Sequence, residues 1–147
     1  MKAGSFGILT IIHALLALFL IIELGLVSYV VDITWRWSAV QFLLFTVVWS
    51  ILVLVYVVFA PAFLPRAHIP IAVLAVLGIT MIFWFAGATA VAADIGVPDC
   101  AGNRSCQVTQ ASVAFAYFIW AGFLGLFGLE AMAYWKSRGP AANADKV

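Results

Sequence analysis

Long apolar stretches separated by short polar connections dominate the pattern along this chain. The stretches cover residues 8–31, 38–60, 71–93 and 111–133, and each contains 23 or 24 residues. At about 1.5 Å of rise per residue, such a helix is about 35 Å long, which exceeds the roughly 30 Å hydrocarbon core of a bilayer. The pattern therefore predicts an all-α integral membrane protein, with four transmembrane helices in an antiparallel bundle.

Composition supports this interpretation. Hydrophobic residues make up 67% of the chain and charged residues 9%, whereas soluble domains contain about 45–50% and 25%. The net charge of +1 gives no basic face for a nucleic acid. The aromatic residues form no cofactor box and no paired histidines occur in facing spans, so we expect no cofactor and no metal. The first apolar stretch is longer than the roughly 7–15 residues of a signal-peptide core, so we expect it to remain as a span.

The charged residues at the ends of the stretches predict the orientation. We expect a short N-terminal segment (1–7), a four-span domain (8–135) and a disordered C-terminal tail (136–147). Positively charged flanks are retained on the cytoplasmic side, and five Lys and Arg residues fall on one side against two on the other. The larger set is Lys2, Arg66, Lys136, Arg138 and Lys146, and the smaller is Arg36 and Arg104. Both termini are therefore predicted to be cytoplasmic, with the loop 94–110 on the opposite side.

The only cysteines, Cys100 and Cys106, lie in that loop. Disulfides persist in the oxidising environment expected there, and a ring of this size would stabilise the fold by roughly 2–2.5 kcal/mol. A thiol oxidoreductase is the alternative, but that chemistry favours a Cys-x-x-Cys pair with further cysteines. Between the cysteines, Asn103-Arg104-Ser105 matches the N-glycosylation pattern. We expect it to be mostly unmodified, because the ring lies close to two spans.

Three ionisable residues, His13, Glu23 and Glu130, fall within the predicted spans. Charged groups are costly there and by default suggest a function. His13 and Glu130 lie near the inner ends of their spans, at depths that would let them pair. The alternative, which we favour, is that Glu130 extends toward the headgroups near Lys136.

Glu23 lies deeper, at roughly 12 Å from the outer end of its span by helix rise. If its role is structural, it is neutral or hydrogen-bonded to donors, because desolvation disfavours the charged carboxylate. The candidate donors at similar depth are Thr46, Trp84 and Tyr117.

Small residues on the third and fourth spans predict close helix packing. Ala and Gly allow helix backbones to approach closely in lipid, and the candidate contact residues are Gly87, Ala90, Ala121 and Gly125. Packing within one monomer is the interpretation we favour. A face for self-association is the alternative.

Two segments around the cysteines carry a family resemblance. They are Phe85-Ala-Gly-Ala-Thr-Ala-Val-Ala and Gln107-Val-Thr-Gln-Ala-Ser-Val-Ala-Phe-Ala-Tyr117-Phe. With the four spans, they resemble the MARVEL-domain family of four-span membrane proteins, over about residues 8–135. The combination is most similar to the fungal plasma-membrane branch of non-classical export proteins associated with eisosomes and sphingolipid-responsive microdomains. The chain departs from that branch in lacking a long basic tail and in carrying Glu23.

This resemblance implies a non-enzymatic role in organising membrane domains or vesicle cargo, at the plasma membrane or in secretory vesicles. The expected partners are membrane lipids, including sterol or sphingolipid, and other membrane proteins or further copies of the chain. A small proton-coupled transporter using Glu23 is the alternative, because four-span multidrug transporters place a carboxylate in the first span. Those chains are shorter and rarely have an external loop closed by cysteines.

Overall fold

In the computed structural model, the described residues are 2–63, 69–96 and 98–139, with side chains described from Gly7 onward. They form four α-helices: α1 (Lys2–Thr34), α2 (Ser38–Phe63), α3 (Pro70–Ile95) and α4 (Arg104–Arg138). Each helix is long and apolar enough to cross a membrane. The predicted four-helix membrane bundle is therefore confirmed.

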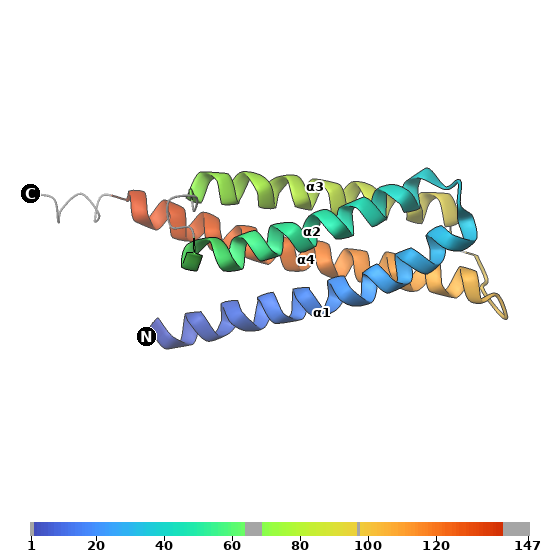
Figure 1. Ribbon diagram of the computed structural model, residues 1–147, viewed down its shortest axis with the longest axis horizontal. Helices are drawn as coiled ribbons and strands as arrows, with labels where there is room; N and C mark the ends of the chain where they lie inside the picture. The colour runs from blue at the N-terminus through green and yellow to red at the C-terminus, as the bar shows by residue number, and fades with distance from the viewer. Residues whose placement is uncertain (1, 64–68, 97, 140–147) are drawn as a thin grey trace, which may run out of the picture.

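The helices are arranged as a ring in which each contacts two others. α1 packs on α2, α2 on α3, α3 on α4, and α4 closes the ring against α1. The N-terminal end of α1 and the C-terminal end of α4 lie at one end of the bundle, and the loop before α4 lies at the other (Figure 1). Toward its N-terminal end, α1 diverges from the other three helices. Within the described part of the chain, the contact between the first and last helices is the only one that joins helices distant in sequence.

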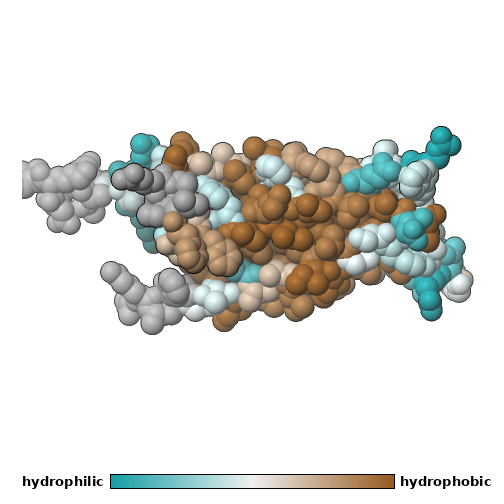
Figure 2. Space-filling model, viewed as in Figure 1, coloured by the Kyte–Doolittle hydropathy of each residue, from teal (hydrophilic) through white to brown (hydrophobic). Residues whose placement is uncertain are grey.

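On the face of the molecule shown in Figure 2, apolar side chains cover the middle of the bundle, and polar side chains gather toward its ends. All four helices contribute to this outer surface, for example with Ile21, Leu52, Ile82 and Phe118. Such a surface is unfavourable in water and is suited to the hydrocarbon core of a bilayer.

The fourth helix begins earlier than its apolar stretch. Asn103 caps it, because its side-chain oxygen accepts a hydrogen bond from the Cys106 backbone N–H at 3.3 Å. Asn is among the preferred N-cap residues. The prediction of an irregular loop over 94–110 is therefore wrong at both ends, since α3 continues to Ile95 and α4 starts at Arg104. Helical hydrogen bonds do not require apolar residues. The hydropathy pattern therefore predicts which part of a helix lies in the bilayer, but not where the helix begins and ends.

The last helix also ends later than predicted. α4 continues to Arg138, so the first three residues of the predicted tail (136–147) are helical. Residues 140–147 lie outside the described residues. The basic side chains of Lys136 and Arg138 in this last turn interact favourably with the negative end of the helix dipole.

Prolines bound the connection between the second and third helices. Pro61 falls in the last turn of α2, where it cannot donate a backbone hydrogen bond to the carbonyl oxygen four residues earlier, and the helix ends two residues later. Pro70 starts α3, a position that suits its fixed φ. Arg66, one of the residues used to predict the orientation, lies outside the described residues, as does Lys146.

Hydrogen bonds between side chains join α2 to α3 inside the apolar core. The Trp84 indole N–H donates to the Ser50 hydroxyl at 2.8 Å, and that hydroxyl donates to the Thr46 carbonyl oxygen at 2.7 Å. Trp49 donates in the same way to the Thr80 hydroxyl at 3.0 Å. Trp84 is completely buried, so its polar atom requires such a partner.

Apolar side chains pack closely over much of the interface between α1 and α4. Phe19 and Phe115 meet edge to face with their ring centroids 5.6 Å apart. At Gly122, a Cβ atom would lie 2.6 Å from Leu16 Cδ2, which is too close for the present position of that methyl group. The absence of a side chain at this position therefore brings α4 close to α1.

Candidate functional site: the polar groups of the bundle

The loop before α4 is closed over the start of that helix by the Cys100–Cys106 disulfide, as predicted. Within the ring, the Asn103 backbone N–H donates to the Cys100 carbonyl oxygen at 3.0 Å. Gly102 adopts a positive φ of 78°, a conformation that glycine adopts without steric cost. The bridge therefore joins a tight turn to the N-cap of α4, which supports a structural role. Asn103 is exposed, and its lack of glycosylation stays a prediction.

Glu23 is fully buried, with 0% of its surface exposed. Its Oε1 accepts a hydrogen bond from the Ser112 hydroxyl of α4 at 2.6 Å, while its Oε2 has no partner among the described residues. A buried carboxyl group requires a hydrogen-bond partner, and the Ser112 hydroxyl is the one that Glu23 has among the described residues. The arrangement connects α1 to α4 in the middle of the bundle and gives the acid no direct contact with water.

The donors predicted for Glu23 were wrong. Thr46 donates to the Phe42 carbonyl oxygen, Trp84 donates to Ser50, and the Tyr117 hydroxyl is 3.2 Å from that of Thr89. The sequence gives the depth of a residue in its span but not the rotation of the helix about its axis. Ser112 was missed because the fourth span was placed at 111–133, at whose edge this residue would lie. With α4 starting at Arg104, Ser112 lies two turns inside the helix, level with Glu23.

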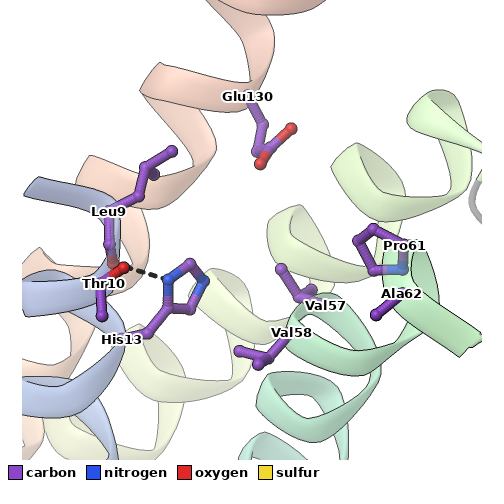
Figure 3. A pocket seen from close by; sticks show the side chains of 8 residues that line it. All are labelled: Leu9, Thr10, His13, Val57, Val58, Pro61, Ala62 and Glu130. Atoms are coloured by element: carbon purple, nitrogen blue, oxygen red, sulfur yellow. Dashed lines mark hydrogen bonds between the residues drawn. The ribbon is translucent and has the colours of Figure 1, made fainter. Parts of the chain in front are cut away.

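His13 and Glu130 line one cavity near the end of the bundle where α1 diverges, as Figure 3 shows. The His13 Nδ1 lies 2.7 Å from the Leu9 carbonyl oxygen of the preceding turn. No hydrogen bond or ion pair joins His13 to Glu130 among the described residues, so the pairing that their depths allowed is not formed. Lys136 lines a neighbouring hollow, and the extension of Glu130 toward the headgroups stays a prediction.

The small residues predicted to pack α3 against α4 do not do so. Gly87 is buried against α2, where a Cβ atom would lie 3.1 Å from Leu43 Cδ1. Ala90, Ala121 and Gly125 are exposed, and a Cβ atom at Gly125 would meet nothing within 4 Å. The small residues that are fully buried are instead Ala88 and Ala116, and Gly122 lies close against Leu16. The alternative use of the exposed small residues, as a face for self-association, stays open.

Comparison with known proteins identifies the family. The model of the MARVEL membrane-associating domain matches residues 6–129, which include most of each of the four helices. No curated protein and no solved structure matches the chain. The matched region contains Glu23 and Ser112 and the disulfide, and it covers most of the chain. This protein is therefore a multi-pass membrane protein that belongs to the MARVEL family of membrane-associating domains.

Proposed function

We propose that this MARVEL protein organises plasma-membrane or vesicle-membrane domains through lateral contacts with lipids, including sterol or sphingolipid, and with further copies of itself. The observation that carries this proposal is the outer surface of the bundle, where apolar side chains from all four helices face outward. Polar side chains within the bundle, such as Glu23, Ser50 and Thr80, are buried. The described residues thus offer contact surfaces rather than an arrangement for chemistry. More specifically, we propose that the protein associates with eisosome-like microdomains.

The exposed glycine of α4 provides the test of self-association. Gly125→Leu should change the free energy of unfolding by less than about 0.5 kcal/mol, because surface changes away from packed contacts usually do. The larger side chain should nevertheless hold a second copy away from this face and reduce clustering, measured by energy transfer between fluorescently labelled copies. Gly25→Leu is the matched control, because Gly25 is also exposed and equally open but lies on α1.

Gly87→Leu separates loss of clustering from loss of fold. Leucine at this buried position would overlap Leu43, and overpacking costs about 1–3 kcal/mol. Clustering that falls for Gly87→Leu but stays unchanged for Gly125→Leu would contradict the role of the exposed face.

Proton-coupled transport through Glu23 is the alternative function. A buried ionisable group within a span supports it, but exchange of a proton with substrate requires a water-filled cavity around the acid. Glu23 has no exposed surface, so this observation favours the structural role.

Glu23→Gln distinguishes the two functions. The amide oxygen of glutamine can still accept from Ser112, so the bundle should keep its stability and its clustering while the titratable group is removed. Ser112→Ala, which removes the donor, should cost about 1 kcal/mol, in the range measured for hydrogen bonds between membrane helices. Reconstituted wild-type protein should show no proton flux that depends on Glu23. A flux abolished by Glu23→Gln would establish the transporter instead.

A further inference from the structure

A cavity of about 510 Å³ opens between α1, α2 and α4 near the end of the bundle where α1 diverges. Its size falls in the range of about 300–1,000 Å³ that is usual for small-molecule sites. Val57, Val58 and Pro61 of α2 and Leu9 of α1 provide apolar walls. The cavity is thus large enough for part of a hydrocarbon chain, and its surface suits one.

Apart from the Thr10 hydroxyl, which can donate and accept, the polar side-chain atoms of the residues that line this cavity act as acceptors toward it. The Leu9 carbonyl oxygen can only accept, so the His13 Nδ1 at 2.7 Å carries the hydrogen of that bond. In the neutral ring, Nε2 is then an acceptor, and it is buried without a partner among the described residues. Glu130 lines the cavity from α4, and its carboxylate is an acceptor as well.

These two groups project into the same space from different helices (Figure 3). A buried acceptor without a donor costs about 1–3 kcal/mol, so a donor that reaches Nε2 would be favoured. Lys136 does not fill this role, because it lines a separate hollow that shares Leu9 with the cavity. A phosphate or carboxylate would bring further acceptors and negative charge beside Glu130, which is unfavourable. The geometry therefore selects a head group that donates hydrogen bonds and carries no negative charge.

We propose that this cavity binds a membrane amphiphile with a primary ammonium head and no phosphate, its ammonium between His13 Nε2 and the Glu130 carboxylate and its chain against the α2 wall. An ammonium has three donors and no acceptor, so it satisfies both groups at once. The positive charge adds attraction to Glu130 that an alcohol of the same length lacks. This site is independent of the contacts between copies proposed above.

The test compares three probes that share the same hydrocarbon tail and differ in the head group: dodecylamine, dodecanol and dodecanoate. Ligands that bind the native state raise its thermal stability according to their affinity, so the full chain is melted in nonionic detergent across a series of probe concentrations. Dodecylamine should stabilise the wild-type protein most, dodecanol less, and dodecanoate not at all. Equal stabilisation by all three probes would indicate that only their hydrocarbon tails bind the protein, and it would overturn the proposal.

Variants of the two acceptors locate the site. Glu130→Gln keeps the shape but removes the charge, and His13→Phe keeps a ring but removes the acceptor. Each should weaken dodecylamine binding at least about tenfold, as expected for a charge-assisted hydrogen bond. Lys136→Gln, in the neighbouring hollow, should bind as the wild type does. Unchanged amine affinity in both acceptor variants would overturn the proposal.

A further variant covers the case in which the acceptor variants do not fold. Ala62→Trp places a large ring at the exposed edge of the cavity without altering either acceptor, and it should abolish binding of dodecylamine. Retained binding in Ala62→Trp would exclude this cavity as the site.

Discussion

Trp84→Ala should lower the free energy of unfolding by about 3–5 kcal/mol, the range for truncation of a large buried aromatic residue. Trp84 is fully buried, so alanine would leave a cavity that the surrounding helices cannot fill. The change also removes the hydrogen bond from α3 to the Ser50 hydroxyl of α2. Unfolding of the purified protein in detergent micelles, followed by circular dichroism, measures the loss.

Two further tryptophan variants separate the contributions. Trp84→Phe retains most of the ring but lacks the indole N–H, so it should have an intermediate effect. Trp35→Ala is the matched control, because Trp35 is 78% exposed and its removal should change stability by less than about 0.5 kcal/mol. Equal effects of Trp84→Ala and Trp35→Ala would contradict the assignment of Trp84 to the core.

Replacement of both Cys100 and Cys106 by serine should lower the free energy of unfolding by about 2–2.5 kcal/mol. The bridge closes a short ring at the N-cap of α4, and its removal restores conformational freedom to the unfolded loop. Membrane insertion should persist, because the spans enter the bilayer through their hydrophobicity. Thermal unfolding of the wild type with and without a reducing agent provides the second measurement.

The double variant itself serves as the control for reduction. A reducing agent should destabilise the wild-type protein to the level of the variant and should leave the variant unchanged. If the oxidised, reduced and substituted proteins all melt at the same temperature, the bridge contributes no stability to this loop.

The sequence predicted the features that depend on hydropathy and local chemistry. Four apolar stretches of sufficient length required four helices, and two cysteines close together in a polar segment indicated the disulfide, which the structure contains. The start of α4 was predictable in principle, because Asn103 precedes the helix and Asn is a common N-cap. It was missed because the boundary was taken from hydropathy alone.

The contacts between helices could not be predicted in the same way. Each span is apolar on nearly all sides, so no polar face indicates which side turns inward. The depths of Glu23 and Gly87 were therefore known but not their neighbours, and the partners expected for both were wrong. Ser112 and Leu43 become evident as partners only when the rotation of each helix is known.

The ring arrangement has a consequence for the order in which the protein assembles during synthesis. Among the described residues, α1 packs on α2 and α4 but not on α3, so the side of α1 that faces α4 has no protein neighbour until the last helix is made. During that interval, the Glu23 acid lies in the membrane without the Ser112 hydroxyl, 89 residues further along the chain. Until then, the first helix is held in the bilayer by its apolar residues and by its contact with α2. The arrival of α4 closes the ring and brings the Ser112 hydroxyl to the Glu23 acid.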